Sequence, residues 1–218
     1  MITVKNLTTA EQYLAVNVIV RAFSADPAAR WLYPDAADYQ QYFGRFVRAF
    51  AGGAFAYGRV DCVGGDYGAA LWLAPGAPTD EAALFSLLQE SLDDSRRDEA
   101  FALIDEMERC HPSEPHWYLP MIGVDPAKQG CGYGSALLAH ALRRCDRDRK
   151  SAYLEASSPK SMMLYERHGF ERLGTIQVGS SPPLFPMLRT PRRQQPEQQI
   201  DSLMRNQMLE GWRSPTAR

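Results

Sequence analysis

Three glycines at alternate positions, Gly130, Gly132 and Gly134, stand at the start of a predicted helix. An apolar stripe at helical spacing indicates that helix from Ser135 onward. Each glycine in a first helical turn costs up to roughly 1 kcal/mol relative to alanine, so three of them need a reason. The first N–H groups of a helix have no partner within the helix, and glycines let an anion approach them closely. The pattern indicates a phosphate-binding turn, whereas a plain flexible joint needs only one glycine.

Two well-known phosphate-binding motifs do not fit this turn. The dinucleotide fingerprint has the spacing G-x-G-x-x-G, whereas the spacing here is G-x-G-x-G. The Walker loop requires Gly-Lys followed by Ser or Thr, which this segment lacks. The segment Gln129–Gly134, QGCGYG, fits a third pattern, Gln/Arg-x-x-Gly-x-Gly/Ala.

The elements that would position the turn alternate along the chain. A strand over 116–124 leads into the glycines, a helix over 134–147 follows, and a strand over 151–157 precedes a short helix in the segment SMMLYERHGF. This alternation predicts a local parallel or splayed arrangement of the two strands.

The remaining elements are predicted to be mainly antiparallel strands and covering helices. They are an edge strand in ITVKNL, a helix opened by the capping box Thr8–Glu11 and reaching about Phe23, a helix over 35–51, a hairpin of strands near 54–63 and 67–74, one or two helices within 79–110, and a final pair of strands in ERLGTIQVG and PLFPMLR. The segment between the first two helices carries two prolines and two aromatic residues, Trp31 and Tyr33, which we expect to be exposed.

Composition and charge exclude several classes of protein. Of 218 residues, 45% are apolar and 23% charged, and the formal net charge is −2. Such a balance is typical of a globular protein and argues against a nucleic-acid partner, which would select a strongly basic surface. No apolar run is long enough to span a membrane, and the first residues lack the layout of a signal peptide. The four cysteines are widely spaced, so we expect reduced thiols in a cytoplasmic protein and no metal site.

The chain is predicted to divide into one domain over 1–189 and a tail over 190–218. Apolar residues recur at helical spacing in the tail, namely Ile200, Leu203, Met204, Met208 and Trp212. This pattern predicts an amphipathic helix that docks on its own domain or on a second subunit, so a homodimer is possible.

At these motifs the sequence resembles the GNAT superfamily of acetyl-CoA-dependent N-acetyltransferases. The segment LPMIGVDPAKQGCGYGSALL matches its pattern of apolar strand, Val, Pro and glycine loop, and Leu164-Tyr165-x-x-x-Gly169-Phe170 matches its downstream motif. The closest resemblance, over roughly residues 3–190, is to puromycin N-acetyltransferase-like members. The resemblance implies an α/β (α+β) fold with a mixed central sheet of about seven strands, splayed between the fourth and fifth and flanked by helices.

The resemblance also implies acetyl-CoA as the acyl donor, with no metal. Backbone groups of the glycine loop would hold its diphosphate, namely those of Gln129, Gly130, Cys131, Gly132, Tyr133, Gly134 and Ser135. Backbone groups of Ile122, Gly123 and Val124 would hold the pantetheine arm, and an N–H near Ile122 would polarise the thioester carbonyl. Relatives often carry lysine where this chain has Cys131, and Lys128 could partly replace that contact.

Two residues are the predicted catalytic groups. By resemblance Tyr165 lies near the thioester sulfur and acts as general acid; a phenol has a reference pKa of about 10, which suits protonation of a thiolate. Glu155, in the predicted strand 151–157, would accept a proton from the amine, bind the substrate ammonium or form a salt bridge with an arginine. His111, Glu114 and His116 are weaker candidates for the same role.

The acceptor is predicted to be the primary amine of a small molecule. It would enter beneath the 24–34 segment, where Trp31, Tyr33 and Tyr118 would form an aromatic wall. The predicted function is transfer of an acetyl group to that amine in a ternary complex. The alternatives are a catalytically idle CoA-binding regulatory module on the same fold, or an enzyme that acetylates proteins or peptides.

Overall fold

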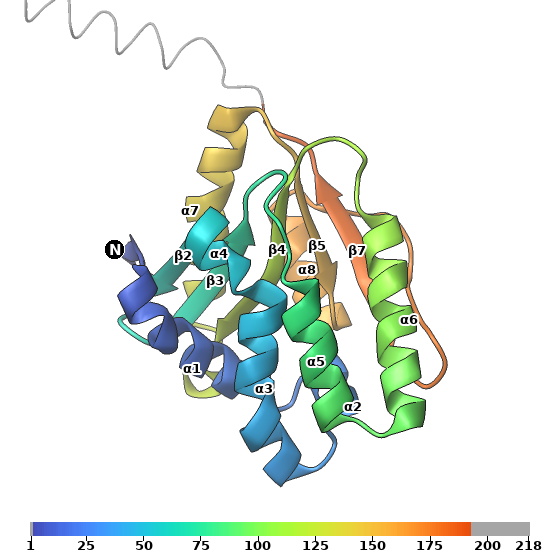
Figure 1. Ribbon diagram of the computed structural model, residues 1–218. Coiled ribbons are helices and arrows are strands. Elements are labelled where there is room, and N and C mark those ends of the chain that lie inside the picture. The colour runs from blue at the N-terminus through green and yellow to red at the C-terminus, as the bar shows by residue number, and fades with distance from the viewer. Residues whose placement is uncertain (1, 193–218) are drawn as a thin grey trace, which may run out of the picture.

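A computed structural model describes residues 2–192 of the chain, and Figure 1 shows its elements. In chain order they are β1 (Val4–Asn6), η1 (Thr9–Glu11), α1 (Gln12–Ala22), α2 (Pro27–Leu32), α3 (Ala36–Ala51), α4 (Gly53–Tyr57), β2 (Gly58–Val63), β3 (Gly68–Leu73), α5 (Glu81–Ser91), α6 (Asp94–Cys110), β4 (Trp117–Val124), η2 (Pro126–Lys128), α7 (Tyr133–Asp148), β5 (Ala152–Ala156), α8 (Pro159–Arg167), β6 (Glu171–Arg172) and β7 (Phe185–Arg189).

The strands form a seven-stranded mixed sheet in the order β1-β2-β3-β4-β5-β7-β6. Neighbouring strands are antiparallel except β4 and β5, which are parallel and pair at Trp117 with Ala152 and at Tyr118 with Tyr153. Beyond Tyr118, β4 continues to Val124 without this pairing, so the two strands part. The predicted fold class is confirmed, including the splay between the fourth and fifth strands.

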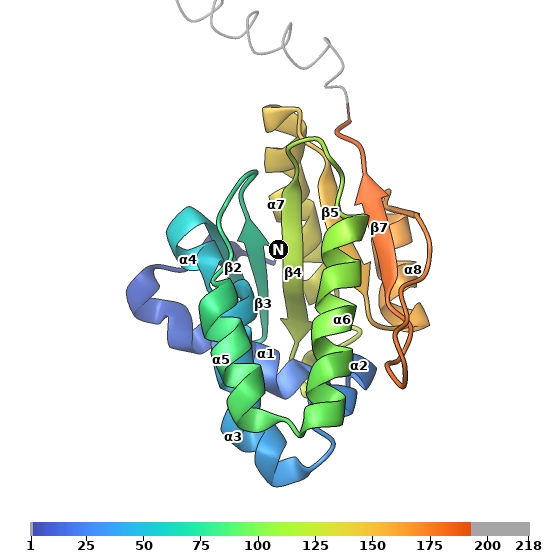
Figure 2. The ribbon, with the colours of Figure 1, turned by 45° about the vertical axis from the view of Figure 1, so that its right-hand side comes forward.

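Helices cover both faces of the sheet. Figure 1 shows α3 and α5 in front of the strands and α7 behind them, and the rotated view in Figure 2 places α6 on the same side as α5. The apolar stripe predicted on the helix after the glycines is buried, and Leu137, Leu138 and Cys145 pack in the core between α7 and the sheet. A second core, between the sheet and the front helices, includes Ile19, Phe43 and Leu88. A separate apolar cluster therefore joins the helices to the sheet on each of its two faces.

The structure contains two short helices that were not predicted from the sequence. The segment predicted to open the first hairpin strand forms the short helix α4 at Gly53–Tyr57, so β2 begins only at Gly58. The segment between the first two predicted helices forms the other one, α2, because the Asp26 carboxylate accepts from the N–H groups of Ala28 and Ala29 and Pro27 occupies the first helical position.

The last strand pair is shorter than predicted. β6 contains only Glu171 and Arg172, and the chain then meets β7 again through a bridge between Ile176 and Leu184. The tail helix predicted from the spacing of Ile200 to Trp212 lies outside the described residues, so its docking site and the homodimer stay predictions.

Within the described residues, no helix has both the length and the apolar character needed to cross a membrane. The same part of the chain contains no cluster of three or more His, Cys, Asp or Glu side chains that could hold a metal ion.

Candidate active site

The glycine loop has a backbone that other residues would find hard to adopt. Gly130 and Gly132 have φ values of 78° and 82°, in the left-handed region that favours glycine. Gly134 meets a different constraint, because a Cβ there would lie 3.3 Å from Leu164 Cδ2. Gly130 and Gly132 therefore shape the turn, and Gly134 lets α8 pack against the start of α7.

The turn leaves a row of backbone donors free. Gly132 precedes α7 and provides no side-chain cap for it. Within residues 2–192, the amide N–H groups of residues 130–135 have no hydrogen-bond acceptor. Unpaired N–H groups at a helix N-terminus form a site for an anion.

A cavity of about 940 Å³ joins this turn to the interior of the protein. It passes between β4 and β5, where the sheet splits, and reaches the helices on the front face. Most of the predicted donor-binding residues line it, namely Ile122, Gly123, Val124, Gln129, Gly130, Gly132, Tyr133, Gly134 and Ser135. Cys131 is exposed and lies outside the lining, so the structure does not place its side chain at the site.

Cationic side chains surround the glycine loop. Lys128, Lys160 and Arg167 line this end of the cavity, and Lys160 Nζ donates to Gln129 Oε1 over 3.1 Å. Lys160 and Arg167 lie on α8, opposite the loop, and the sequence analysis missed both. In the sequence, the one feature that links these two residues to the site is that they belong to the short helix that carries Tyr165. The spacing of residues along the chain does not show that this helix faces the glycine loop.

Tyr165 lies on α8 and lines the cavity with 7% of its surface exposed. Its ring packs edge-on against Phe170, with 5.9 Å between ring centroids. Burial raises the pKa of its phenol, and the charge of Asp26 raises it further, so the hydroxyl stays protonated at neutral pH. Among the hydrogen bonds of the described residues there is none to this hydroxyl, which is therefore free to donate to a ligand.

Glu155 also lines the cavity, from β5, and its side chain is 4% exposed. Its Oε2 accepts from the Tyr118 hydroxyl over 2.9 Å. Its Oε1 is buried and has no hydrogen-bond partner, with His111 Nε2 3.6 Å away. A buried carboxylate oxygen without a donor costs roughly 1–3 kcal/mol, so this oxygen is free to accept a hydrogen bond from a ligand.

Asp26 is a second carboxylate at the cavity that the sequence analysis did not identify. Its Oδ1 accepts from the first N–H groups of α2, and its Oδ2 accepts from the Ser157 hydroxyl, just beyond β5. Burial is the largest influence on it and raises its pKa, although these donors oppose the shift. With both oxygens engaged, Asp26 holds α2 against the end of β5.

The acceptor side of the cavity is apolar. Phe43, Phe46 and Phe50 line it from one face of α3, with centroid separations of 5.9 Å and 5.4 Å between successive rings. Leu88 of α5 and residues of α6, including Leu103, Ile104 and Met107, complete this wall. The spacing of the three phenylalanines in the sequence puts them on one helix face. It predicts a face packed in the core as readily as a face that lines a cavity.

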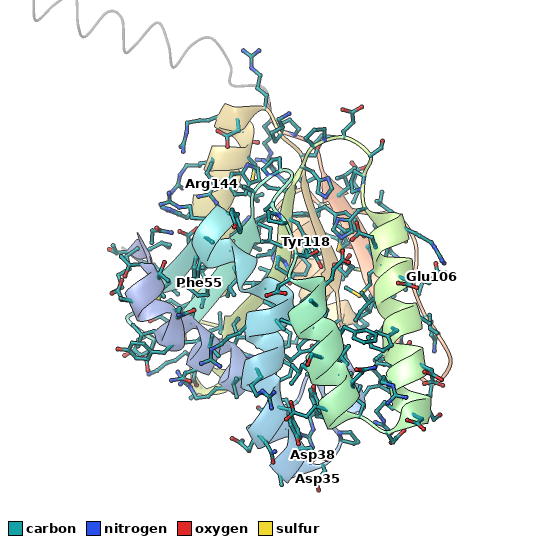
Figure 3. The ribbon with its side chains drawn as sticks, in the orientation of Figure 1. Asp35, Asp38, Phe55, Glu106, Tyr118 and Arg144 are labelled. Atoms are coloured by element: carbon teal, nitrogen blue, oxygen red, sulfur yellow. The ribbon has the colours of Figure 1, made fainter. Side chains whose placement is uncertain are left out.

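Of the three residues predicted to form the aromatic wall, only Trp31 is among the residues that line the cavity. Trp31 lines the cavity and donates from Nε1 to Ser180 Oγ over 3.0 Å. Tyr33, expected to be exposed, is 1% exposed and bonds through its hydroxyl to Ser91 outside the lining. Tyr118 packs against the core on the front face of the sheet (Figure 3) and reaches the site only through Glu155.

The matching family model covers the elements that build this site. Residues 97–172 match the family described as acetyltransferase (GNAT) domain, and they include β4, the glycine loop, α7, β5 and α8. A mycothiol acetyltransferase from Kineococcus radiotolerans is 39% identical over 67 residues, which are 29% of this chain and 22% of that protein. The match thus spans about a fifth of that relative's length.

These findings support membership of the GNAT superfamily.

Solved GNAT-fold structures extend the similarity to most of the chain. A structure from Corynebacterium glutamicum, described as histone acetyltransferase HPA2 and related acetyltransferase, has a TM-score of 0.63 and 28% identity, and covers 88% of this chain and 98% of its own. Arylalkylamine N-acetyltransferase 2 from Aedes aegypti has a TM-score of 0.62 with 14% identity, covering 88% and 99%. At 14% identity, the similarity to the Aedes aegypti structure shows a shared fold only. The front helices that wall the cavity are therefore part of a GNAT fold.

Proposed function

We propose that this protein transfers an acetyl group from acetyl-CoA to the primary amine of a small molecule with an apolar body, in a ternary complex. The observation that carries the proposal is the continuity of one cavity. It joins free backbone donors and cations at one end, Tyr165 and Glu155 in the middle, and an apolar chamber at the other end. Each region suits one part of the reaction.

The donor would be held along the split in the sheet. Amides of residues 130–135 would bind the diphosphate, and Lys160 and Arg167 would add positive charge. The pantetheine arm would run along β4 where β5 no longer pairs with it, like an added strand. Pro120, which has no N–H, lines this slot. An N–H near Ile122 would polarise the thioester carbonyl.

The chemical step needs one proton acceptor and one proton donor. The amine nitrogen forms a bond to the acetyl carbon while the carbon–sulfur bond breaks. Glu155 takes one proton from the bound ammonium group, which frees the nitrogen lone pair for attack, and Tyr165 gives its proton to the departing thiolate. The second proton that the nitrogen loses on forming the amide returns Tyr165 to its protonated state. The burial that raises the pKa of Tyr165 keeps that proton in place until the thiolate forms.

The chamber favours an acceptor that carries one positive charge on an apolar body. Its walls from α3, α5 and α6 are apolar, and the carboxylates among the lining residues are Asp26 and Glu155. Asp26 is already bonded through both oxygens, which leaves Glu155 for the amine. Proteins with this fold include an arylalkylamine and an agmatine N-acetyltransferase. Of these two acceptor types, the apolar walls suit an arylalkylamine better, because a second cation would lie against phenylalanine and leucine side chains. The resemblance to puromycin N-acetyltransferase-like members remains part of this proposal.

The test is release of free CoA thiol from acetyl-CoA with a panel of arylalkylamines, aliphatic diamines, agmatine and peptide N-termini. The proposal expects kcat/KM for an arylalkylamine to exceed that for a diamine of similar length by about tenfold or more, the effect of roughly 1.4 kcal/mol. CoA binding without turnover of any amine would indicate the idle module, and acetylation confined to peptides would indicate a protein-modifying enzyme.

A further inference from the structure

A chain of ionisable side chains leads from Glu155 away from the cavity. Glu155 Oε1 lies 3.6 Å from His111 Nε2, and His111 Nδ1 lies 3.2 Å from His116 Nε2. His116 Nδ1 lies 2.8 Å from the backbone oxygen of Glu114. His111 follows α6 and His116 precedes β4, so the two histidines stand at the two ends of the segment 111–116 that leads into the strand.

With both rings neutral, the contacts fix which ring nitrogens carry protons. A backbone oxygen only accepts, so His116 Nδ1 must donate to Glu114. In the neutral ring His116 Nε2 is then an acceptor, and His111 Nδ1 must donate to it. His111 Nε2 is consequently the unprotonated nitrogen, and it faces Glu155 Oε1.

This assignment explains the 3.6 Å separation between Glu155 and His111. An ionised carboxylate oxygen and an unprotonated ring nitrogen are both acceptors, and two acceptors do not approach to hydrogen-bond distance. A single proton on Glu155 converts the pair into a donor and an acceptor. The gap therefore closes only after Glu155 has taken a proton.

We propose that His111 and His116 relay to solvent the proton that Glu155 takes from the amine. The proposal rests on the proposed function, because only the acetyl transfer supplies that proton. Protonated Glu155 gives its proton to His111 Nε2, and His111 passes its Nδ1 proton to His116 Nε2. His116 then loses its Nδ1 proton to water, which leaves an ionised Glu155 and one proton on each ring, now on Nε2. Before the next turnover each ring exchanges this proton with water and returns to the resting form with its proton on Nδ1. No oxidant, metal or further reactant is needed.

The surroundings of the two histidines disfavour a stable positive charge on His116. Burial is the main cause that lowers the pKa of His116, and the neighbouring His111 adds to the shift, so His116 releases a proton readily. The titratable groups that face the pair are Tyr118 on β4, Tyr153 and Glu155 on β5, and Glu108 on α6, and the backbone oxygen of Glu114 accepts from His116. The His111 side chain is 18% exposed, compared with 4% for Glu155, so accessibility to water rises from Glu155 to His111.

The first test compares turnover by His111→Gln and His116→Gln with the wild-type protein and with His140→Gln. His140 is a partly exposed histidine on α7, away from the cavity lining, and its variant controls for the loss of a ring. The relay predicts that His111→Gln lowers kcat by about tenfold or more near pH 6.5, the usual contribution of a proton-transfer group, with the KM for acetyl-CoA unchanged. The loss should shrink as pH rises, because hydroxide can then take the proton from Glu155. His116→Gln should show a smaller loss of the same form, and His140→Gln none.

Rescue separates a relay from a packing role. In His111→Ala, added imidazole should restore turnover in proportion to its concentration, while the same addition leaves His140→Ala unchanged. Loss of a proton-transfer group should lower turnover by about tenfold. If His111→Gln instead turns over within about twofold of the wild type at pH 6.5, the relay is overturned and the proposed function still stands. A wild-type protein that acetylates no amine would overturn both.

A second readout does not use activity. Nitrogen-15 spectra of histidine-labelled protein should show both His111 and His116 with the proton on Nδ1, and Glu155→Gln should shift the His111 signals. A His111 proton on Nε2 in the resting protein would contradict the relay.

Discussion

The Tyr118 hydroxyl donates to Glu155 Oε2 over 2.9 Å at the point where the sheet divides. Tyr118 and Tyr153 form the last residue pair between β4 and β5, and Glu155 follows two residues later on β5. The bond fixes the carboxylate at the start of the slot and occupies one of its oxygens. The other oxygen has no hydrogen-bond partner and is the one that, in the proposed function, takes the amine proton.

Replacing Tyr118 by Phe should remove this donor and leave Glu155 with no hydrogen bond from a hydroxyl. We expect a loss of roughly 1–3 kcal/mol in the free energy of unfolding, the cost of a buried polar group without a partner. The matched control is Tyr153→Phe, because the Tyr153 hydroxyl is buried without a partner and its removal should be neutral or stabilising. Urea titration of both variants measures the difference, and equal losses would contradict the assignment.

Replacing Tyr165 by Phe should lower kcat by about tenfold or more while the affinity for CoA stays similar, as expected for loss of a general acid. Because burial raises the pKa of this phenol above its ordinary value, the wild-type acid stays protonated as pH rises through neutrality. The kcat of the wild type should therefore show no alkaline decline assignable to Tyr165 below about pH 10, the reference pKa of a phenol. Tyr13→Phe, at an exposed tyrosine, should change neither quantity.

Gly130→Ala and Gly65→Ala form a matched pair for testing the anion site. The φ values are 78° and 80°, and an added Cβ would have no atom within 4 Å at either position. Both should lose about 1–2 kcal/mol of stability, the cost of a side chain in the left-handed region. Gly130→Ala should also weaken CoA binding, because its methyl group would stand where the diphosphate approaches. Equal CoA affinity in the two variants would argue against the proposed cradle.

Asp146→Asn should destabilise the packing of α7 against β7. Arg189, which is 3% exposed, donates to both oxygens of Asp146 over 2.8 Å and 2.9 Å. Burial is the largest single influence on Asp146 and opposes its ionisation, but the bonds from Arg189 and the Arg192 N–H together with the charges of both arginines outweigh it, and the pKa of the carboxyl is lowered. We expect a loss of roughly 1.5–3 kcal/mol at pH 7, the contribution of hydrogen bonds to charged groups.

The pH dependence of that loss follows from the sign of the shift. A carboxyl with a lowered pKa in the folded state contributes its full stability above its unfolded pKa of about 3.9. The contribution disappears as pH falls through the lower folded value. The difference between wild type and Asp146→Asn, measured by urea unfolding, should therefore shrink below about pH 4. Asp94→Asn, whose side chain is 90% exposed beside Arg97, should show almost no difference at either pH.

Local patterns predicted the parts of the site that depend on the backbone. The alternating glycines required a special turn, and Gly130 and Gly132 have the left-handed φ values that explain them. The alternation of strands and helices around the loop predicted a parallel or splayed arrangement of β4 and β5, and the resemblance to the GNAT superfamily implied their separation. These features are local in the chain, so one sequence is enough to show them.

The acceptor chamber was predicted poorly, because it forms where helices from distant parts of the chain meet. Tyr33 looked like a surface aromatic but packs in the core, since Asp26 starts an unexpected helix before it. Phe43, Phe46 and Phe50 share one helix face, but only the positions of α5 and α6 show that this face borders a cavity. The contact between His111 and Glu155 likewise joins residues separated by 44 positions, and no local spacing indicates it.

The central claim is that the amides of residues 130–135 bind the diphosphate of an acyl donor. Titration calorimetry with acetyl-CoA and with S-acetyl-pantetheine, which lacks the diphosphate and nucleotide, tests it most directly. We predict that acetyl-CoA binds about a hundredfold more tightly or better, which corresponds to roughly 2.7 kcal/mol. The difference should narrow in Gly130→Ala and persist in Gly65→Ala. Equal affinity for the two compounds, or no binding of acetyl-CoA at all, would contradict the account.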